Sequence, residues 1–458
     1  MIAYYFQLAV AHLRRNIWLT ALIVAAIAVG IGSSMTVFTV LYALAGDPMP
    51  WKSSHLFAPS LDTNDPRQPR EKGLQTYLNA GLLSYPDAMA ISGLHQALHQ
   101  AAMFPVTQVA RIDDPVVLPV NVEAQATEAD FFTMFDVPFV SGAPWAQKDD
   151  DARANVVVIS ESLAAHFFPG INPVGRTLQL GIHDFRIVGV TGRWAPFPAF
   201  YDPLGVTNAA KIKSGPELFM PIETAVDREF APTGFTSYAA LFAADQLPKW
   251  PQGTPILKIY FATPMFLQTQ LWVELRSAAD AAGYRRVLEG YAAQFQQRSG
   301  ITWMPATSLR SMREWLSLAP QTASMRRELG LAAWVAFGFL LVCLANAAAL
   351  MLARFARSSN DLAIRRALGA PRSAVMTQCL VEAGVIGILG GVAGVAVTLL
   401  GLQLERLSVP REMIRAVHMD WQLVFATIAA AAFVTFGAGL YPAWRASRQR
   451  NVWAFGSL

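Results

Sequence analysis

The chain has 458 residues, of which 53% are hydrophobic and only 15% are charged. An average soluble domain is nearer a quarter charged, so this composition indicates a membrane protein when the apolar residues form long runs. The formal net charge is +4. Because the arginines gather beside apolar runs, this excess reflects membrane topology and argues against a nucleic-acid partner.

Four apolar runs are long enough to cross a bilayer, which takes about 20 residues. They predict transmembrane helices at residues 17–45, 329–353, 375–404 and 421–443, and the third contains a single charged residue. A soluble protein would need four unusually long core helices instead. Although Ala43-Leu44-Ala45 matches a signal-peptidase motif, the first run is far longer than the apolar core of a signal peptide, about 7–15 residues. We therefore expect a retained first span.

The arginines orient these spans. Residues 354–374 carry five arginines against one acid, and the stub 1–16 and the tail 444–458 are also basic, whereas the loop 405–420 balances three arginines with three acids. The positive-inside rule places the stub, the 354–374 connector and the tail in the cytoplasm. Residues 46–328 and the short loop 405–420 are then expected on the other side of the membrane, outside the cytoplasm.

Residues 46–328 are predicted to form a large mixed α/β domain inserted between the first and second helices. Val156 to Ile159 is a β-branched run typical of a strand, and the residues after it have helical spacing up to Pro169-Gly170. Residues 271–276 alternate as in a strand, and 284–295 repeat apolar residues at steps of three and four, as in an amphipathic helix. No helix or strand can be predicted for the segment 201–253.

Motifs for catalysis are absent. The sequence has no G-x-x-x-x-G-K-[ST], H-E-x-x-H or G-x-S-x-G motif, and its cytoplasmic segments are too short for a nucleotide-binding domain. We therefore expect no enzyme activity and no cofactor in this chain, with ATP and Mg²⁺ bound by a separate subunit. His95 and His99 could share a helix face as metal ligands, but no third ligand is near; they and the loop acids Asp149-Asp150-Asp151 are expected to be solvated, with no metal site.

The third span combines small residues with one acid. Its glycines are candidates for helix packing, either within one bundle or at a dimer seam, and Gly30, Gly32, Ser33 and Ser34 form a competing seam in the first span. The candidate packing glycines are Gly387, Gly390, Gly391 and Gly394. Glu382 is expected to snorkel or to form an intramembrane ion pair, with Arg365 or Arg366 as partner, while a proton relay is the alternative.

Several stretches resemble a known family. "AIRRALGAPRSAV" with the following "QCLVEAGVIGILGGVAG" closely resembles the FtsX-type permease domain of MacB-like ABC systems, as does the closing "YPAWRASRQRNVWAF". The external domain resembles the MacB-type periplasmic core at four places in the same order. These are "LSYPDAMAI" (83–91), "ATEADFFTMFDVPFVSG" (126–142), "VVVISESLAAHFFPGINPVGRTLQLGIHDFRIVGV" (156–190) and "ELFMPIETA" (217–225).

The resemblance implies a permease subunit of a bacterial inner membrane, with four spans and a large periplasmic domain between the first two. It implies an ABC ATPase dimer, supplied here by a separate chain, and a second permease copy or a paralogous permease, all among membrane lipids. Such systems couple ATP hydrolysis to movement of the periplasmic domain, called mechanotransmission. The expected function is export or extraction of a peptide, antibiotic or lipid-linked substrate. If export crosses two membranes, a periplasmic adaptor and an outer-membrane duct are expected as further partners. The alternative is FtsX-like signalling to a periplasmic hydrolase or sensor.

The resemblance also implies that the 354–374 connector is a coupling helix that docks on the ATPase. Family members often have Glu where this chain has Asp361, and either acid suits a helix start. A plain positive-inside anchor would explain the arginines but not the apolar side chains among them. The predicted docking residues are Asp361, Leu362, Ile364, Arg365, Arg366, Leu368, Gly369 and Arg372.

Overall fold

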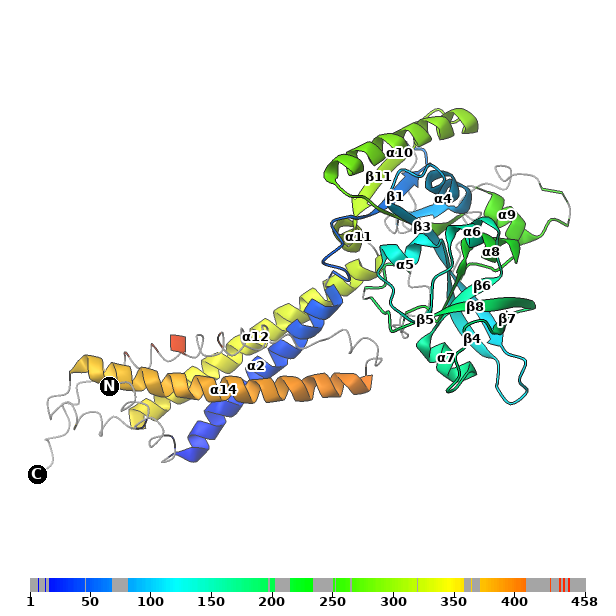
Figure 1. Cartoon of the computed structure of the whole chain (residues 1–458). Coiled ribbons are helices and arrows are strands. Elements are labelled where there is room, and N and C mark those ends of the chain that lie inside the picture. Colours follow the sequence, from blue (N-terminus) through cyan, green and yellow to red (C-terminus); the bar gives the residue numbers. More distant parts are fainter. Residues whose placement is uncertain are drawn as a thin grey trace, which may run out of the picture. The chain divides into compact units, whose positions relative to one another are not determined.

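The structure is a computed structural model that divides into two compact units, Met1–Leu44 with Arg326–Leu458, and Ala45–Met325. They are described separately below (Figure 1). The described residues are 16–45, 47–67, 81–196, 198–201, 215–233, 250–251, 253–263, 266–318, 320–357 and 371–408, with isolated positions at 7, 13, 364, 429, 436–437, 440 and 444.

The Ala45–Met325 unit is built on one large sheet, as its described residues show. Its strands are β1 (Leu56–Asp62), β2 (Leu82–Ser84), β3 (His99–Arg111), β4 (Val120–Thr127), β5 (Phe139–Gly142), β6 (Val156–Ser160), β7 (Thr177–Leu180), β8 (His183–Thr191), β9 (Leu218–Pro221), β10 (Leu267–Glu274) and β11 (Ala306–Ser311). The order is β11-β1-β10-β3-β4-β9-β6-β8-β5, with β2 beside β10 and β7 beside β3 and β8. Only the β4–β9 and β6–β8 pairs are parallel among these strands.

Helices pack on this sheet, and two hydrophobic cores form. The helices are α4 (Tyr85–Ser92), α5 (Asp130–Met134), α6 (Gln147–Asp151), α7 (Glu161–Phe167), α8 (Ile222–Asp227), α9 (Ile256–Ala262), α10 (Ala278–Ser299) and α11 (Met312–Leu318). Because strand side chains alternate between faces, Leu271 and Val273 enter one core and Trp272 enters the other. The second is rich in aromatic rings, and we call it the aromatic core; Phe131, Phe219 and Trp315 belong to it.

Local capping explains where the predicted helices begin and end. Ser160 Oγ accepts a hydrogen bond from the backbone N–H of Leu163 at 3.2 Å, and Ser277 Oγ accepts one from the backbone N–H of Asp280 at 3.1 Å. Each serine therefore caps the start of a helix. Helix α10 ends at Gly300, whose φ of +68° suits glycine. The predicted strands near 156–159 and 271–276, and the helices after them, are confirmed.

Two local predictions in this unit were wrong. His95 lies in the turn after α4 and His99 begins β3, so the two histidines share no helix face. The acidic run 149–151 is not a loop but part of α6, and Asp150 is only 5% exposed. Among the described residues no group of three or more metal-ligating side chains comes together.

The other unit contains long apolar helices. These are α2 (Ile17–Ala45), α12 (Pro320–Arg357) and α14 (Arg372–Ser408). Three stretches of the described chain are long and apolar enough to cross a membrane: 17–39, 330–357 and 373–404. They correspond to the first three predicted spans. The fourth prediction, 421–443, lies outside the described residues except for isolated positions.

Candidate functional site

The predicted docking segment lies between α12 and α14. Arg372 is the first residue of α14, and Ile364 is 59% exposed. The remaining predicted docking residues lie outside the described part of the chain: Asp361, Leu362, Arg365, Arg366, Leu368 and Gly369. Their role stays a prediction.

A buried ion pair joins the two helices that flank this segment. Arg354, in the last turn of α12, donates from Nε to Glu382 Oε1 of α14 at 2.8 Å, and its Nη2 lies 2.7 Å from the same oxygen. The two side chains are only 3% and 5% exposed. Arg354 also donates from Nη1 to Thr20 Oγ1 of α2, so one guanidinium connects three helices. We call these three residues the arginine clamp.

The clamp shows which group faces Glu382. The expected partners, Arg365 and Arg366, lie outside the described residues, so their pairing with Glu382 stays a prediction; among the described residues, Arg354 lies at this carboxylate. The pair is 28 residues apart in sequence, on two helices whose facing was not predictable from hydropathy. A buried charge in a membrane unit is tolerated when a partner and further hydrogen bonds satisfy it, and Thr20 supplies such a bond.

Small residues set how closely these helices approach. A Cβ atom added to Gly390 would lie 2.6 Å from Ile27 Cγ2, and one added to Gly394 would lie 3.1 Å from Ile31 Cγ2. The two glycines therefore allow α14 to contact α2 within the same chain, which is the bundle-packing alternative. Gly387 and Gly391 are buried as well.

The seam residues predicted in the first span contact both neighbouring helices. A Cβ on Gly32 would lie 2.5 Å from Val397 of α14, and one on Gly30 would lie 2.6 Å from Cys343 Cβ of α12. Ser34 Oγ donates to the carbonyl of Ala336 at 2.9 Å. These contacts, like the arginine clamp, join α2, α12 and α14 of one and the same molecule.

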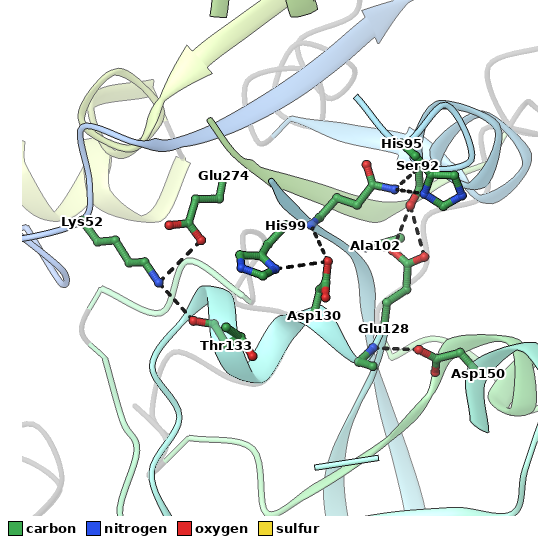
Figure 2. A network of polar contacts seen from close by, with 12 residues as sticks. Lys52, Ser92, His95, His99, Ala102, Glu128, Asp130, Thr133, Asp150 and Glu274 are labelled. Atoms are coloured by element: carbon green, nitrogen blue, oxygen red, sulfur yellow. Dashed lines mark hydrogen bonds and ion pairs between the residues drawn. The ribbon is translucent and has the colours of Figure 1, made fainter. Parts of the chain in front are cut away.

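A second set of polar contacts lies in the Ala45–Met325 unit, where β4 leads into α5 (Figure 2). Glu128 accepts the amide of Ala102 at 2.7 Å and the hydroxyl of Ser92 at 3.1 Å. Asp150 accepts the amide of Ala129 at 2.8 Å and the indole N–H of Trp145 at 2.8 Å. Burial raises the pKa of Glu128 to about 7 and that of Asp150 to about 7.

The neighbouring side chains extend this network around α5. Asp130 accepts the amide of Gln100 at 3.2 Å and lies 3.5 Å from His99 Nδ1. Lys52 donates to the carbonyl of Thr133 at 3.0 Å and lies 3.5 Å from Glu274. Figure 2 shows these groups on both sides of the short helix. Since each partner is a backbone group or another side chain, the network holds α5 against β3 and has the character of structural support.

Sequence reasoning missed this network because its members are far apart along the chain. Glu128 accepts the amide N–H of Ala102 on β3, and Asp150 accepts the amide N–H of Ala129, the residue that follows Glu128. The sequence pattern instead groups Asp150 with the solvated acids 149–151. A usable signal was present: Trp145 lies five residues before Asp150, and a buried tryptophan needs an acceptor for its indole N–H.

Comparison with known proteins gives two matching family models. The MacB-like periplasmic core domain matches residues 20–291, and the FtsX-like permease C-terminal model matches residues 333–450. The macrolide export ATP-binding/permease protein MacB of Syntrophobacter fumaroxidans is 24% identical over 340 residues, covering 70% of this chain and 45% of that protein. A probable syringafactin export ATP-binding/permease protein SyfD of Pseudomonas syringae pv. tomato is 22% identical over 282 residues, covering 61% of this chain and 34% of that protein. The chain thus spans less than half the length of these two relatives.

Solved structures also match the chain. The periplasmic region of MacB from Actinobacillus actinomycetemcomitans is 11% identical, with a TM-score of 0.35, and covers 61% of this chain and 95% of that one. The extracellular domain of the transporter YknZ from Gram-positive bacteria is 12% identical, with a TM-score of 0.32, and covers 55% and 99%. The first family model by itself covers more than half of the chain, and the second covers the remaining apolar helices. The chain therefore belongs to the MacB-like, FtsX-like family of ABC transporter permeases.

Proposed function

We propose that this chain is the permease subunit of an ABC system of a bacterial inner membrane, with four spans and a periplasmic domain. A separate cytoplasmic ATPase dimer binds ATP and Mg²⁺ and moves the periplasmic domain through the spans. The outcome is export or extraction of a peptide, antibiotic or lipid-linked molecule. A second permease copy or a paralogue completes the transporter, with an adaptor and an outer-membrane duct where export crosses two membranes.

The arginine clamp is the observation that supports this proposal. Helix α12 ends at Arg357 and α14 begins at Arg372, so the predicted docking segment connects them directly. Arg354 binds Glu382 across these two helices and also contacts Thr20 of α2. A displacement of the docking segment would therefore be shared by the three helices instead of bending one of them.

The order of elements along the chain shows how movement of the docking segment would reach the periplasmic unit. Helix α2 ends at Ala45, where the periplasmic unit begins, and α12 covers the residues where that unit ends. Both covalent connections of the periplasmic unit therefore run through helices that Arg354 contacts. The names of the relatives support export as the outcome, since they are export ATP-binding/permease proteins for a macrolide and for syringafactin.

The docking assignment is tested by charge reversal. Arg365→Glu with Arg366→Glu should abolish co-purification with a co-expressed ABC ATPase subunit while the chain still inserts into the membrane. Arg445→Glu with Arg448→Glu in the tail is the matched control, since it makes the same charge change on the same predicted side. If the Arg365/Arg366 double variant retains its ATPase as well as the control does, the docking assignment is wrong.

Transport and signalling are distinguished by a second measurement. In the docked complex, Glu382→Gln should keep the ATPase bound but lower the ATP-dependent release of substrate, because the clamp is weakened and not the docking surface. A complex that hydrolyses ATP, releases no substrate and instead activates a periplasmic hydrolase would contradict export and favour the signalling alternative.

A further inference from the structure

The segment that follows the first membrane helix is fixed to the periplasmic unit by directed polar contacts. Helix α2 leads into residues 47–53, which we call the exit loop. Lys52 of this loop donates from Nζ to the carbonyl of Thr133 at 3.0 Å. The same nitrogen lies 3.2 Å from Asp136 Oδ1 and 3.5 Å from Glu274 Oε2, and Figure 2 shows its contacts with Thr133 and Glu274. One ammonium group therefore joins the exit loop to α5, to the turn after α5 and to the end of β10.

The surroundings of this lysine fix its orientation. The side chains of Lys52 and Glu274 are only 19% and 11% exposed. Asp136 has a φ of +48°, a left-handed conformation in which aspartate and asparagine are enriched among residues other than glycine. Its second carboxylate oxygen accepts the indole N–H of Trp51 at 3.1 Å, so two adjacent donors of the exit loop bind one carboxylate. Such charge-assisted contacts are directional, whereas apolar packing is not.

Helix α5 is also held at its other end, by the sheet. Asp130, the first residue of α5, accepts the backbone N–H of Gln100 on β3 at 3.2 Å. Between the two ends, Phe131 lies in the aromatic core, where Met49 of the exit loop is buried as well. Helix α5 therefore lies between the exit loop at its C-terminal end and β3 at its N-terminal end, so a shift of the loop relative to β3 would tilt it.

We propose that Lys52 is a positioning residue of the permease, through which a movement of α2 reaches α5. Strand β1 follows the exit loop along the chain, so the sheet receives such a movement through the backbone. Helix α5 is far from the loop in sequence and receives it through side chains. This inference rests on the proposed function, because it names a residue that passes on the ATP-driven movement of the first span.

Hydrogen exchange followed by mass spectrometry tests this step without a substrate. The full-length protein is measured in lipid nanodiscs together with its co-expressed ABC ATPase subunit, with and without ATP. In the natural protein, ATP should change the exchange rates of both the exit loop and α5 by about threefold or more. In Lys52→Met the exit loop should keep this change and α5 should lose it, because methionine retains the apolar stem of lysine and removes the ammonium group.

Matched variants separate transmission of movement from stability. Lys148→Met makes the same change at an exposed lysine of α6 and should leave both responses to ATP intact. Asp136→Asn with Glu274→Gln removes both carboxylate charges, and asparagine still adopts a positive φ. This double variant should reproduce the loss at α5 even if Lys52→Met does not fold. Lys52→Arg keeps the positive charge and should keep most of the response.

Three results would overturn the inference while leaving the proposed function in place. In the first, ATP changes the exit loop of the natural protein but not α5. In the second, α5 of the Lys52→Met variant responds to ATP as the natural protein does. In the third, this variant exchanges faster at α5 by the same factor with and without ATP, which would mean that Lys52 only stabilises the fold. A natural protein whose exit loop does not respond to ATP would contradict the proposed function, and this inference would fall with it.

Discussion

The stability of the periplasmic unit should increase when the pH falls from 7.5 to 5.5. Glu128 and Asp150 both have a pKa raised by burial, to about 7 in each case, from ordinary values of 4.5 and 3.8. A carboxyl whose pKa is higher in the folded protein than in the unfolded chain binds its proton more tightly when folded. Its contribution to stability is therefore fully present at low pH and is lost as the pH rises through the folded value.

The magnitude follows from the two pKa values. One pKa unit corresponds to about 1.4 kcal/mol, and between pH 5.5 and 7.5 each acid passes through most of its folded titration. Each therefore contributes ~2 kcal/mol, and the pair ~4 kcal/mol if they titrate independently. The charge of Asp150 also raises the pKa of Glu128, so the two titrations are coupled and the sum is an upper figure.

The assay is urea unfolding of the full-length protein in nanodiscs, followed by tryptophan fluorescence at the two pH values. Glu128→Gln with Asp150→Asn keeps the shape and removes both titrating groups, so its free energy of unfolding should change little with pH. Asp113→Asn with Glu161→Gln alters two exposed acids and should retain the full dependence of the natural protein. Equal stability of the natural protein at both pH values, or an equal pH effect in the Glu128/Asp150 variant, would refute this reasoning.

Three further predictions concern packing and caps. Glu382→Ala leaves Arg354 buried without its carboxylate and should destabilise the membrane unit by about 3–5 kcal/mol, while Glu382→Leu with Arg354→Leu should recover most of this loss in a thermal melt. Gly390→Leu should lower the melting temperature because its Cβ would lie 2.6 Å from Ile27, whereas Gly384→Leu, with nothing within 4 Å, should not; equal effects would exclude the α2–α14 contact. Ser277→Ala should cost about 1 kcal/mol through loss of the α10 cap, measured by urea unfolding.

Features that depend on one continuous segment were predictable from the sequence. The three described membrane helices belong to this class because spanning a bilayer depends on the length and apolarity of one segment. The strand at 156–160 and helix α10 were predictable because periodicity and capping residues act over a few positions. The permease family was recognisable for a similar reason, since its motifs are continuous stretches.

Features that depend on distant residues could not be predicted in this way. The facing of Arg354 and Glu382, the burial of Asp150 opposite Glu128, and the pairing of β4 with β9 all join segments far apart in the sequence. Hydropathy predicts that Asp150 on α6 is solvated. The alternation of apolar and polar residues along β10 does not by itself show that both faces of this strand are buried. The sequence by itself determined the membrane helices, the α/β character of the inserted domain and the family. Only the tertiary structure decided which charges pair, because that outcome depends on which elements pack together.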